Sequence, residues 1–266
     1  MKRITIKEIQ RKKGRTPITC LTSYTNTFTK ILDKYCDIIL VGDSVGMVLY
    51  GMKTTRNVKI DTMIQHGKAV KDASKRSLVI VDMPYKTYTT KLKAYKNAKK
   101  IIKITKCDGV KLEGGKNIIN IIKYLTKKKI PVMGHVGLLP QYSKSFQLKG
   151  KNITQKKRIF EDAMALVDSG VFAIVIECVV EDLTKKITNS VKVPTIGIGS
   201  SKYCDGQILV TDDMIGMSNF RPKFVKQYSK VNKIIEKSVK NYCKDVKNKK
   251  FPFSKNVYKL KKIYEW

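Results

Sequence analysis

The amino-acid sequence predicts an α/β protein folded as a (βα)8 TIM barrel with additional C-terminal helices. Short apolar runs alternate with segments whose apolar residues recur at helical spacing, a rhythm typical of parallel strands joined by right-handed crossovers. Eight such runs lie between residues 17 and 210, and eight crossovers close best as a barrel. The length of 266 residues suits one domain of this kind.

The pattern places each element in order along the chain. We expect the strands at residues 17–22, 38–44, 78–82, 109–113, 130–135, 173–177, 194–199 and 208–210. Apolar stripes indicate the helices, at Phe28, Ile31, Leu32 and Tyr35; Leu92, Tyr95 and Ile102; Ile118, Ile121, Ile122 and Leu125; and Ile159, Phe160, Ala163, Leu166 and Val167. Gly170 predicts the end of the last of these helices. The connections 43–58 and 136–153 are long for this architecture, which is typical of lids and binding loops.

The chain is interpreted as one domain, residues 1–266, without internal repeats or a Pro/Gly/Ser-rich linker. Residues 225–266 are expected to form a basic helical extension packed on the barrel or on a neighbouring subunit. A role at a membrane surface is the alternative. The apolar residues that predict this packing are Val231, Ile234, Ile235, Val239, Tyr242 and Val246, followed by Phe251, Phe253, Tyr258 and Trp266.

The formal charge of +34 raises the question of a nucleic-acid partner. Only seven of the 55 basic residues are arginine, and the lysines lie on nearly every predicted helix and form no single stripe. We interpret the excess as a solvated lysine surface that can attract anionic small molecules. Specific nucleic-acid binding stays open as an alternative, which tight, sequence-selective binding at high salt would reveal.

Cysteine usage and hydropathy favour a soluble protein of a reducing cytoplasm. The six cysteines form no CxxC pair and have no regular spacing, so reduced and mostly buried thiols are expected. No apolar run reaches the roughly 18 residues of a transmembrane helix, and no signal-peptide core follows the N-terminus.

Six of the expected strands end at, or run into, polar residues suited to chemistry. Burying carboxylates under apolar strands is costly, so their recurrence at strand ends predicts a common site. Asp43, Asp82 and Glu113 supply oxygen ligands and suit Mg²⁺, which keeps several waters. Zinc is disfavoured because the only histidines, His66 and His135, are far apart in the sequence.

These residue types suit a reaction on a 2-keto acid. Magnesium held by two acids can chelate the keto oxygen and the carboxylate, and can stabilise an enolate. Lys111 and His135 can neutralise the negative charge and Ser44 can hydrogen-bond to it. Glu177, at the end of an apolar strand, is the candidate general base.

Structural roles for the same residues remain possible at this point. A strand-end aspartate often caps a turn, Lys111 can simply pair with Glu113, and His135 is as readily structural as functional. His66 lies in a predicted helix and is interpreted as structural. The motif Gly197-Ile198-Gly199 is a weak nucleotide-binding signal because it lacks a third glycine and a following helix.

Several motifs together resemble the ketopantoate hydroxymethyltransferase family, in order from about Ile4 to Phe224. They are Val41-Gly42-Asp43-Ser44-Val45-Gly46-Met47, Val81-Asp82-Met83-Pro84-Tyr85, Val110-Lys111-Leu112-Glu113-Gly114-Gly115, Gly134-His135-Val136-Gly137-Leu138, Ile176-Glu177-Cys178-Val179, Ile196-Gly197-Ile198-Gly199 and Asp205-Gly206-Gln207-Ile208-Leu209-Val210. The resemblance implies a barrel enzyme of pantothenate synthesis. Such an enzyme transfers a hydroxymethyl group from 5,10-methylenetetrahydrofolate to 3-methyl-2-oxobutanoate, giving 2-dehydropantoate.

The resemblance also implies roles for individual residues. Asp43 and Asp82 would ligate Mg²⁺, with Glu113 supporting the metal through water. Ser44 and Lys111 would hold the keto acid and Glu177 would take its proton. The family usually forms a homodecamer, so small molecules and further copies of the chain are the implied partners.

The chain departs from the family pattern in three places. Val180 replaces a proline, Ser200-Ser201 replace Ala-Gly, and Thr211-Asp212-Asp213 replaces a segment expected to contain histidine. These loops are expected near the folate. The alternative enzyme is another magnesium-dependent barrel acting on 2-keto acids, of the phosphoenolpyruvate mutase and isocitrate lyase type, which would show no folate dependence.

Overall fold

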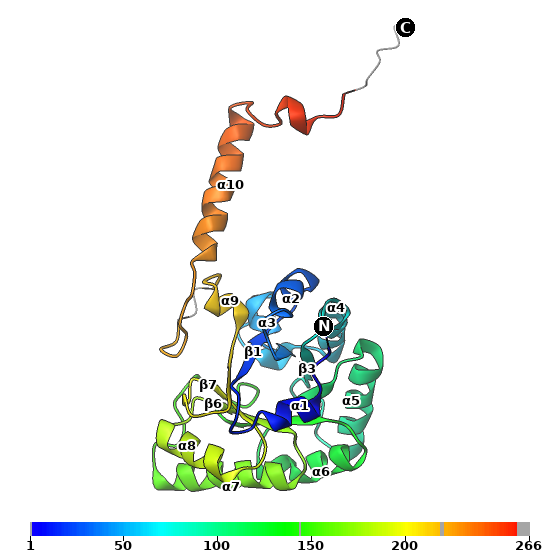
Figure 1. Cartoon of the computed structure of the whole chain (residues 1–266), viewed down its shortest axis with the longest axis vertical. Helices are drawn as coiled ribbons and strands as arrows, with labels where there is room; N and C mark the ends of the chain where they lie inside the picture. The colour runs from blue at the N-terminus through cyan, green and yellow to red at the C-terminus, as the bar shows by residue number, and fades with distance from the viewer. Residues whose placement is uncertain (1, 144, 219–220, 260–266) are drawn as a thin grey trace.

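Eight parallel strands form a closed barrel in the computed structural model, which describes residues 2–143, 145–218 and 221–259. Each strand pairs with the next, and the last pairs with the first through Ile18 to Leu21 and Gly206 to Leu209. The predicted fold class is therefore confirmed (Figure 1). The strands are β1 (Ile18–Thr22), β2 (Ile38–Val41), β3 (Leu78–Asp82), β4 (Gly109–Glu113), β5 (Val132–Gly137), β6 (Ala173–Glu177), β7 (Thr195–Ile198) and β8 (Gly206–Leu209).

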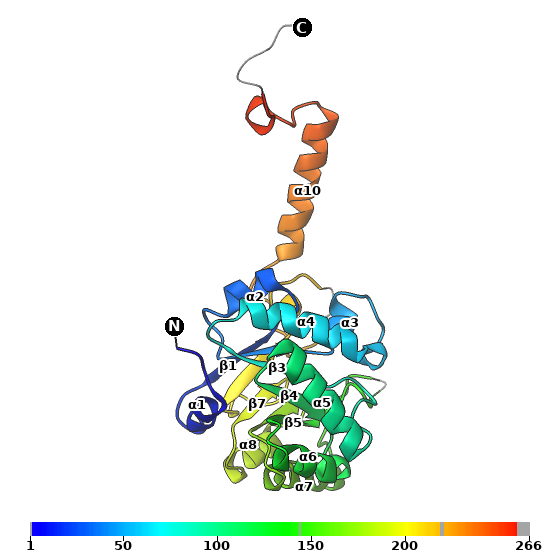
Figure 2. The same cartoon turned by 90° about the vertical axis from the view of Figure 1, so that its right-hand side faces the viewer.

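Helices surround the barrel and connect its strands, as Figures 1 and 2 show from two sides. The stripes expected to be helical fall within α2, α5, α6 and α7, except for Tyr35, which follows α2, and Ile118, which lies in the 3-10 turn before α6. The helices are α1 (Ile6–Arg11), α2 (Asn26–Leu32), α3 (Val45–Val48), α4 (Ile60–Ala73), α5 (Lys91–Thr105), α6 (Ile119–Lys127), α7 (Ile153–Asp168), α8 (Glu181–Ser190), α9 (Thr211–Met214) and α10 (Val231–Lys247), with short 3-10 turns η1 (Thr55–Asn57), η2 (Lys116–Ile118) and η3 (Ser254–Asn256).

Strand residues alternate between two apolar layers. Ile38 and Leu40 of β2 join the cluster inside the barrel, whereas Ile39 and Val41 join the larger cluster between strands and helices. All four residues are buried, which explains why this strand reads as a continuous apolar run. Each fully buried side chain of this size contributes about 1.5–3 kcal/mol, so the two layers hold the strand ends at fixed positions.

Side chains at the helix starts fix where several connections end. Thr25, Thr90 and Asn152 each accept a hydrogen bond from the backbone three residues later, at the first turns of α2, α5 and α7. Such caps contribute about 1 kcal/mol each. Helix α7 ends at Asp168, and Gly170 follows with a φ of +85°, as the stop signal predicted.

The C-terminal extension is helical as predicted, but α10 does not pack on the barrel. None of its residues is buried, and its large apolar residues Ile234, Ile235 and Tyr242 are exposed. Figures 1 and 2 show α10 projecting away from the barrel. The amphipathic pattern of α10 indicates that its apolar face needs a partner, but it does not identify that partner. The barrel is already covered by its own helices, so α10 does not pack there. Trp266 lies outside the described residues.

The six cysteines are all free thiols, and Cys20, Cys36, Cys107 and Cys178 are buried, as expected. Within residues 2–143, 145–218 and 221–259, no helix is both long enough and apolar enough to cross a membrane.

Candidate active site

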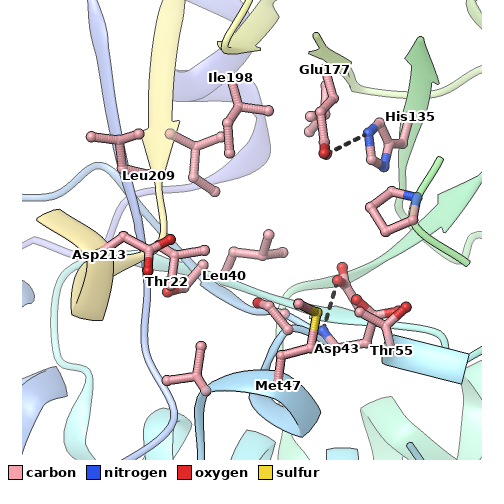
Figure 3. Close-up of a pocket in the computed structure, with 18 of the residues that line it drawn as sticks. Thr22, Leu40, Asp43, Met47, Thr55, His135, Glu177, Ile198, Leu209 and Asp213 are labelled. Carbon is pink, nitrogen blue, oxygen red and sulfur yellow. Dashed lines mark hydrogen bonds and ion pairs between the residues drawn. The ribbon is translucent and has the colours of Figure 1, made fainter. Parts of the chain in front are cut away.

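A single cavity of about 310 Å³ gathers all seven residues that the sequence nominated. They come from the C-terminal ends of five consecutive strands or from the residues directly after them. Figure 3 shows Glu177 and His135 on one side of this cavity and Asp43 on its floor. The seven residues are Asp43, Ser44, Asp82, Lys111, Glu113, His135 and Glu177.

Asp43 and Asp82 form a coupled pair of buried carboxylates. The backbone N–H of Asp43 donates to Oδ2 of Asp82 at 3.0 Å, which ties the turn after β2 to the end of β3. Burial raises the pKa of Asp43, and the charges of Asp82 and Glu113 raise it further. Burial also raises the pKa of Asp82, although Lys111 opposes this. Two adjacent buried acids of this kind are stabilised when a cation binds between them.

Lys111 is the buried cation that this acidic cluster surrounds. Its Nζ lies 3.0 Å from Oδ1 of Asp82, and only about 5% of the side chain is exposed. Burial alone would lower its pKa, but Asp82, Glu113 and Asp43 together raise it above the ordinary lysine value. The ammonium group therefore stays charged and is available to an anionic ligand in the cavity. The predicted alternative pairing with Glu113 is not the contact that forms, since Asp82 takes that place.

His135 lies between two carboxylates. Its Nε2 is 3.2 Å from Oε2 of Glu177, and its Nδ1 is 3.6 Å from Oε1 of Glu113. Neither ring nitrogen makes a well-aligned hydrogen bond, so these contacts are ion pairs. Burial and Lys111 lower the histidine pKa, but the two glutamates outweigh them and raise it to about 9. The ring is therefore an imidazolium at neutral pH.

The backbone around Glu177 is held in an unusual conformation. Cys178, the next residue, has a φ of +49°, which non-glycine residues rarely adopt. Gly137 faces it with a φ of +95°, and a Cβ there would lie 2.3 Å from the carbonyl oxygen of Glu177. The N–H of Leu138 donates to that same oxygen at 2.8 Å. The end of β5 thus fixes the direction in which β6 presents the Glu177 side chain.

Ser44 follows Asp43 directly and lines the same cavity. The hydroxyl groups of Ser44 and Tyr24 are 2.8 Å apart. Burial raises the pKa of Tyr24 to a value that keeps its hydroxyl protonated. His66, interpreted as structural, lies on α4 and bonds the Tyr24 carbonyl at 2.7 Å and the Tyr50 hydroxyl at 2.9 Å. It does not line the cavity, so its contacts agree with the structural interpretation.

Gln141, from the long loop after β5, is the residue that the sequence did not reveal. Its amide Nε2 donates to Oδ2 of Asp43 at 2.8 Å, and its backbone N–H donates to Oε2 of Glu113 at 3.0 Å. The Tyr88 hydroxyl donates to its Oε1, which fixes the orientation of the amide. One loop residue therefore orients two of the three acids. Its only sequence signal was its place in an unusually long connection.

If Asp43 and Asp82 hold Mg²⁺, as the resemblance implies, replacing Gln141 with alanine should weaken binding of the ion about 10–100-fold, the usual effect of losing a side chain that orients a metal ligand. Titration calorimetry would measure this effect without turnover. Gln155→Ala is the matched control, because Gln155 accepts from Gly150 and Lys151 at the other end of the same loop and does not reach the acids. Equal effects of the two changes would mean that only loop order matters.

The acid pair fits a magnesium ion. Oδ1 of Asp82 is buried and lies 3.0 Å from the Lys111 ammonium group, and a carboxylate oxygen carries a second lone pair for a cation. Within the described part of the chain, no group of three or more His, Cys, Asp or Glu residues is placed to hold a metal ion together. A magnesium ion here would therefore rest on one or two carboxylates, with water completing its ligands.

The remaining wall of the cavity is mostly apolar. Leu209 lies across the cavity from His135, on the side of Asp213, and Ile198 lies between Leu209 and Glu177 (Figure 3). Ile198 belongs to the Gly-Ile-Gly motif, which thus contributes to this wall and not to a nucleotide loop. Burial raises the pKa of Asp213, despite a hydrogen bond from Ser218. Of the positions that depart from the family pattern, Asp213 is the one that lines the cavity.

The fold and the site define a (βα)8-barrel enzyme with a buried acid–base centre at the C-terminal ends of its strands. A family model described as ketopantoate hydroxymethyltransferase matches residues 3–254. The chain therefore belongs to the ketopantoate hydroxymethyltransferase family, as its motifs indicated.

Curated relatives match over nearly the whole chain. A protein of Pelagibacter ubique named 3-methyl-2-oxobutanoate hydroxymethyltransferase is 52% identical over 248 residues, which cover 93% of this chain and 96% of the relative. A protein of the same name from Phenylobacterium zucineum is 47% identical, with 97% and 95% covered.

Solved structures share the fold at low sequence identity. Phosphonopyruvate hydrolase in complex with oxalate and Mg²⁺ superimposes with a TM-score of 0.63 at 10% identity, covering 95% of this chain and 93% of the other. The 2,3-dimethylmalate lyase of the phosphoenolpyruvate mutase and isocitrate lyase superfamily gives 0.60 at 10% identity, with 77% and 80% covered.

Proposed function

We propose that this protein transfers a hydroxymethyl group from 5,10-methylenetetrahydrofolate to 3-methyl-2-oxobutanoate, giving 2-dehydropantoate, in the first step of pantothenate synthesis. The observation that carries the proposal is the convergence of seven polar side chains on one cavity, in a chain that matches this family along most of its length. In the balanced reaction, one water supplies the hydroxyl oxygen and tetrahydrofolate leaves.

The keto acid is held at the acidic end of the cavity. Asp43 and Asp82 would hold Mg²⁺ there, Glu113 would support it through water, and the bound ion would supply Lewis-acid stabilisation of the enolate oxygen. Lys111 remains charged and pairs with the substrate carboxylate or the developing oxyanion. The Ser44 hydroxyl, positioned by Tyr24, donates to the same substrate oxygens.

Glu177 removes the proton from the carbon next to the keto group. Its carboxylate lies 3.2 Å from Nε2 of His135, and this contact orients it. Water first releases the one-carbon unit as formaldehyde by breaking its two carbon–nitrogen bonds, and tetrahydrofolate leaves. The carbanion equivalent then attacks the formaldehyde carbon, and the formaldehyde oxygen takes a proton and becomes the new hydroxyl group. The apolar wall opposite His135 keeps bulk water away from the enolate.

Isotope exchange tests this proposal directly. The protein should exchange the proton on carbon 3 of 3-methyl-2-oxobutanoate with deuterated water in a magnesium-dependent way, and should form 2-dehydropantoate only when the folate is added. Exchange without any product in the presence of the folate would contradict transferase activity. That result would favour a lyase or mutase of the phosphoenolpyruvate mutase and isocitrate lyase superfamily. The only support for that alternative is a shared fold at about 10% sequence identity.

We also propose that the protein works as a homo-oligomer, with a decamer as the expected state, and that the apolar face of α10 contacts another copy. That face contains Ile234, Ile235, Val239, Tyr242 and Val246, all exposed in the single chain. Hydrogen bonds from Tyr228 and Val231 to Met214 and Ile215 attach only the start of α10 to its own barrel. An exposed apolar face on a charged helix is typical of an interaction surface.

The double change Ile234→Asp and Val239→Asp should therefore reduce the molecular mass of the particle in solution, measured by light scattering after gel filtration. Ile153→Asp is the control, because Ile153 is also highly exposed but lies on α7. An unchanged mass in the double variant would assign the subunit contacts to another surface.

The proposal also covers the cellular location of the protein and the role of its positive surface charge. We propose a cytoplasmic enzyme, which the six free thiols support. The lysine-rich surface attracts anionic substrates and binds no nucleic acid specifically.

A further inference from the structure

We propose that a second cavity, next to the catalytic one, binds the carboxylate tail of the folate co-substrate. This inference rests on the proposed function, because it assigns a place to one part of the co-substrate. The second cavity has a volume of about 230 Å³. Its own lining residues are Lys53, Thr54, Arg56, Leu138, Ser143 and Ser145.

The two cavities are contiguous. Met47, Thr55, Pro140 and Phe146 line both of them. The shared residues come from the two long connections, after β2 and after β5, that the sequence predicted to be binding loops. A ligand that leaves the catalytic cavity between these connections enters the second cavity directly.

The size of the folate co-substrate requires a binding site that extends beyond the catalytic cavity. Sites that enclose a drug-sized ligand usually measure about 300–1,000 Å³. The catalytic cavity, at about 310 Å³, is at the lower limit and has to accommodate the keto acid and the metal as well. A reduced pterin joined to aminobenzoyl-glutamate is a full drug-sized ligand. Only its reacting part fits beside the keto acid, so the remainder must lie outside.

The charge of the second cavity suits the end of the co-substrate that carries carboxylates. Lys53 and Arg56 line it, and no described lining residue is acidic. Neither cation forms an ion pair with any residue the structure describes. Arg56 is nevertheless held in place, because its Nε donates to the Gln141 carbonyl at 2.9 Å and its guanidinium group lies over the Tyr85 ring. A fixed guanidinium group without a protein carboxylate is ready for a ligand carboxylate.

Thr55 provides a second, independent indication of a ligand. Its side chain is 3% exposed, yet its hydroxyl group has no hydrogen-bond partner. An unsatisfied buried hydroxyl is unfavourable, so this group is suited to a ligand that crosses between the two cavities. Figure 3 shows Thr55 beside Asp43, at the edge of the acid pair where the one-carbon unit would react.

The resulting orientation separates the charges of the two substrates. The keto acid lies at the metal and Lys111, and the one-carbon unit lies near Asp43 and Thr55. The pterin lies against the apolar wall, and the glutamate carboxylates lie between Lys53 and Arg56. Additional glutamates on the tail would extend outward along the exposed side of Lys53, so a polyglutamylated co-substrate should bind more tightly than the monoglutamate.

The test compares two charge reversals of equal size in one connection. Lys53→Glu changes the second cavity, and Lys59→Glu changes an exposed lysine outside both cavities. Because the protein carries a large positive charge, only this matched pair separates a local contact from general steering. The Michaelis constant is measured for methylenetetrahydrofolate with one and with five glutamates, and for the corresponding tetrahydropteroate, which has no glutamate.

Lys53→Glu should raise the Michaelis constant for the monoglutamate about 10-fold and for the pentaglutamate more, whereas Lys59→Glu should change either by less than about 2-fold. With the tetrahydropteroate the two variants should behave alike. Equal effects of the two variants on the glutamylated forms would overturn the inference. So would a Lys53→Glu effect that persists with the tetrahydropteroate.

Failure of the proposed function would look different. In that case the wild-type protein itself would form no 2-dehydropantoate with any of the three co-substrates. The affinity for the tetrahydrofolate monoglutamate, measured by fluorescence, would then still test the contribution of Lys53 to binding, because this measurement does not need turnover. A monoglutamate affinity that is equal in the wild-type and Lys53→Glu proteins would overturn the inference even without turnover.

Discussion

Replacing Glu177 with glutamine should abolish both transferase activity and folate-independent isotope exchange, with a fall in kcat of about 1,000-fold. The amide has the same shape as the carboxylate but cannot accept a proton at neutral pH. Glu177 lies at the end of β6 beside His135, away from the proposed metal ligand Asp43 (Figure 3). Binding of Mg²⁺ and of the keto acid should therefore persist in titration calorimetry.

Glu161→Gln is the matched control for this change, since Glu161 is a partly exposed residue of α7 that pairs with Lys116 on the surface. It should leave exchange and transfer unchanged. Wild-type exchange in Glu177→Gln would assign the base to another residue, and loss of keto-acid binding would indicate a binding role for Glu177 instead.

Replacing Asp82 with asparagine should remove magnesium dependence together with activity. The loss of one direct ligand should weaken Mg²⁺ binding by at least about 100-fold, beyond the usual effect of losing an orienting residue. The corresponding fall in kcat/KM is about 1,000-fold, because a metal ion supplies several kcal/mol of stabilisation to a developing oxyanion. Calorimetric titration and initial rates at several Mg²⁺ concentrations would measure both quantities.

The fold should survive this change. The asparagine carbonyl can still accept from the Asp43 N–H, and Lys111 keeps the nearby charges of Asp43 and Glu113. The melting temperature should therefore shift by no more than about 4 °C. Asp61→Asn, at an exposed position on α4, is the control that should leave metal binding intact. Wild-type metal dependence in Asp82→Asn would remove the metal assignment.

The sequence could predict the barrel because its signal is local and repeated. Each strand is a short apolar run, and each helix shows an apolar stripe that faces the strands. The polar residues at the strand ends could be nominated for the same reason, since parallel strands bring their C-terminal ends to one edge. Asp43, Asp82, Lys111, Glu113, His135 and Glu177 are all placed by that rule, and the structure brings them to one cavity.

Pairing within the site was not predictable from the sequence. Lys111 shares a strand with Glu113, yet its close partner is Asp82 on the neighbouring strand, because the register of β3 and β4 places Asp82 opposite Lys111. Gln141 lies in a loop without periodicity, and no local pattern showed that its amide reaches Asp43, 98 positions away in the sequence. The sequence around Thr55 likewise contains no pattern that indicates a ligand contact. Only the tertiary structure buries its unpaired hydroxyl group between the two cavities.

The C-terminal helix α10 also separates what the sequence determines from what the tertiary structure determines. Its period of apolar residues determined that α10 is an amphipathic helix, because that pattern depends only on residues a few positions apart. The position of this apolar face relative to the barrel depends on the path of the chain before α10 and on the surfaces that α10 can contact. The sequence alone thus determined the strands, the helices and the chemical types at the strand ends, which depend on near neighbours. Only the tertiary structure decided which charges pair, which loop residue orients the acids and which surface stays uncovered, because these depend on contacts between residues far apart in the chain.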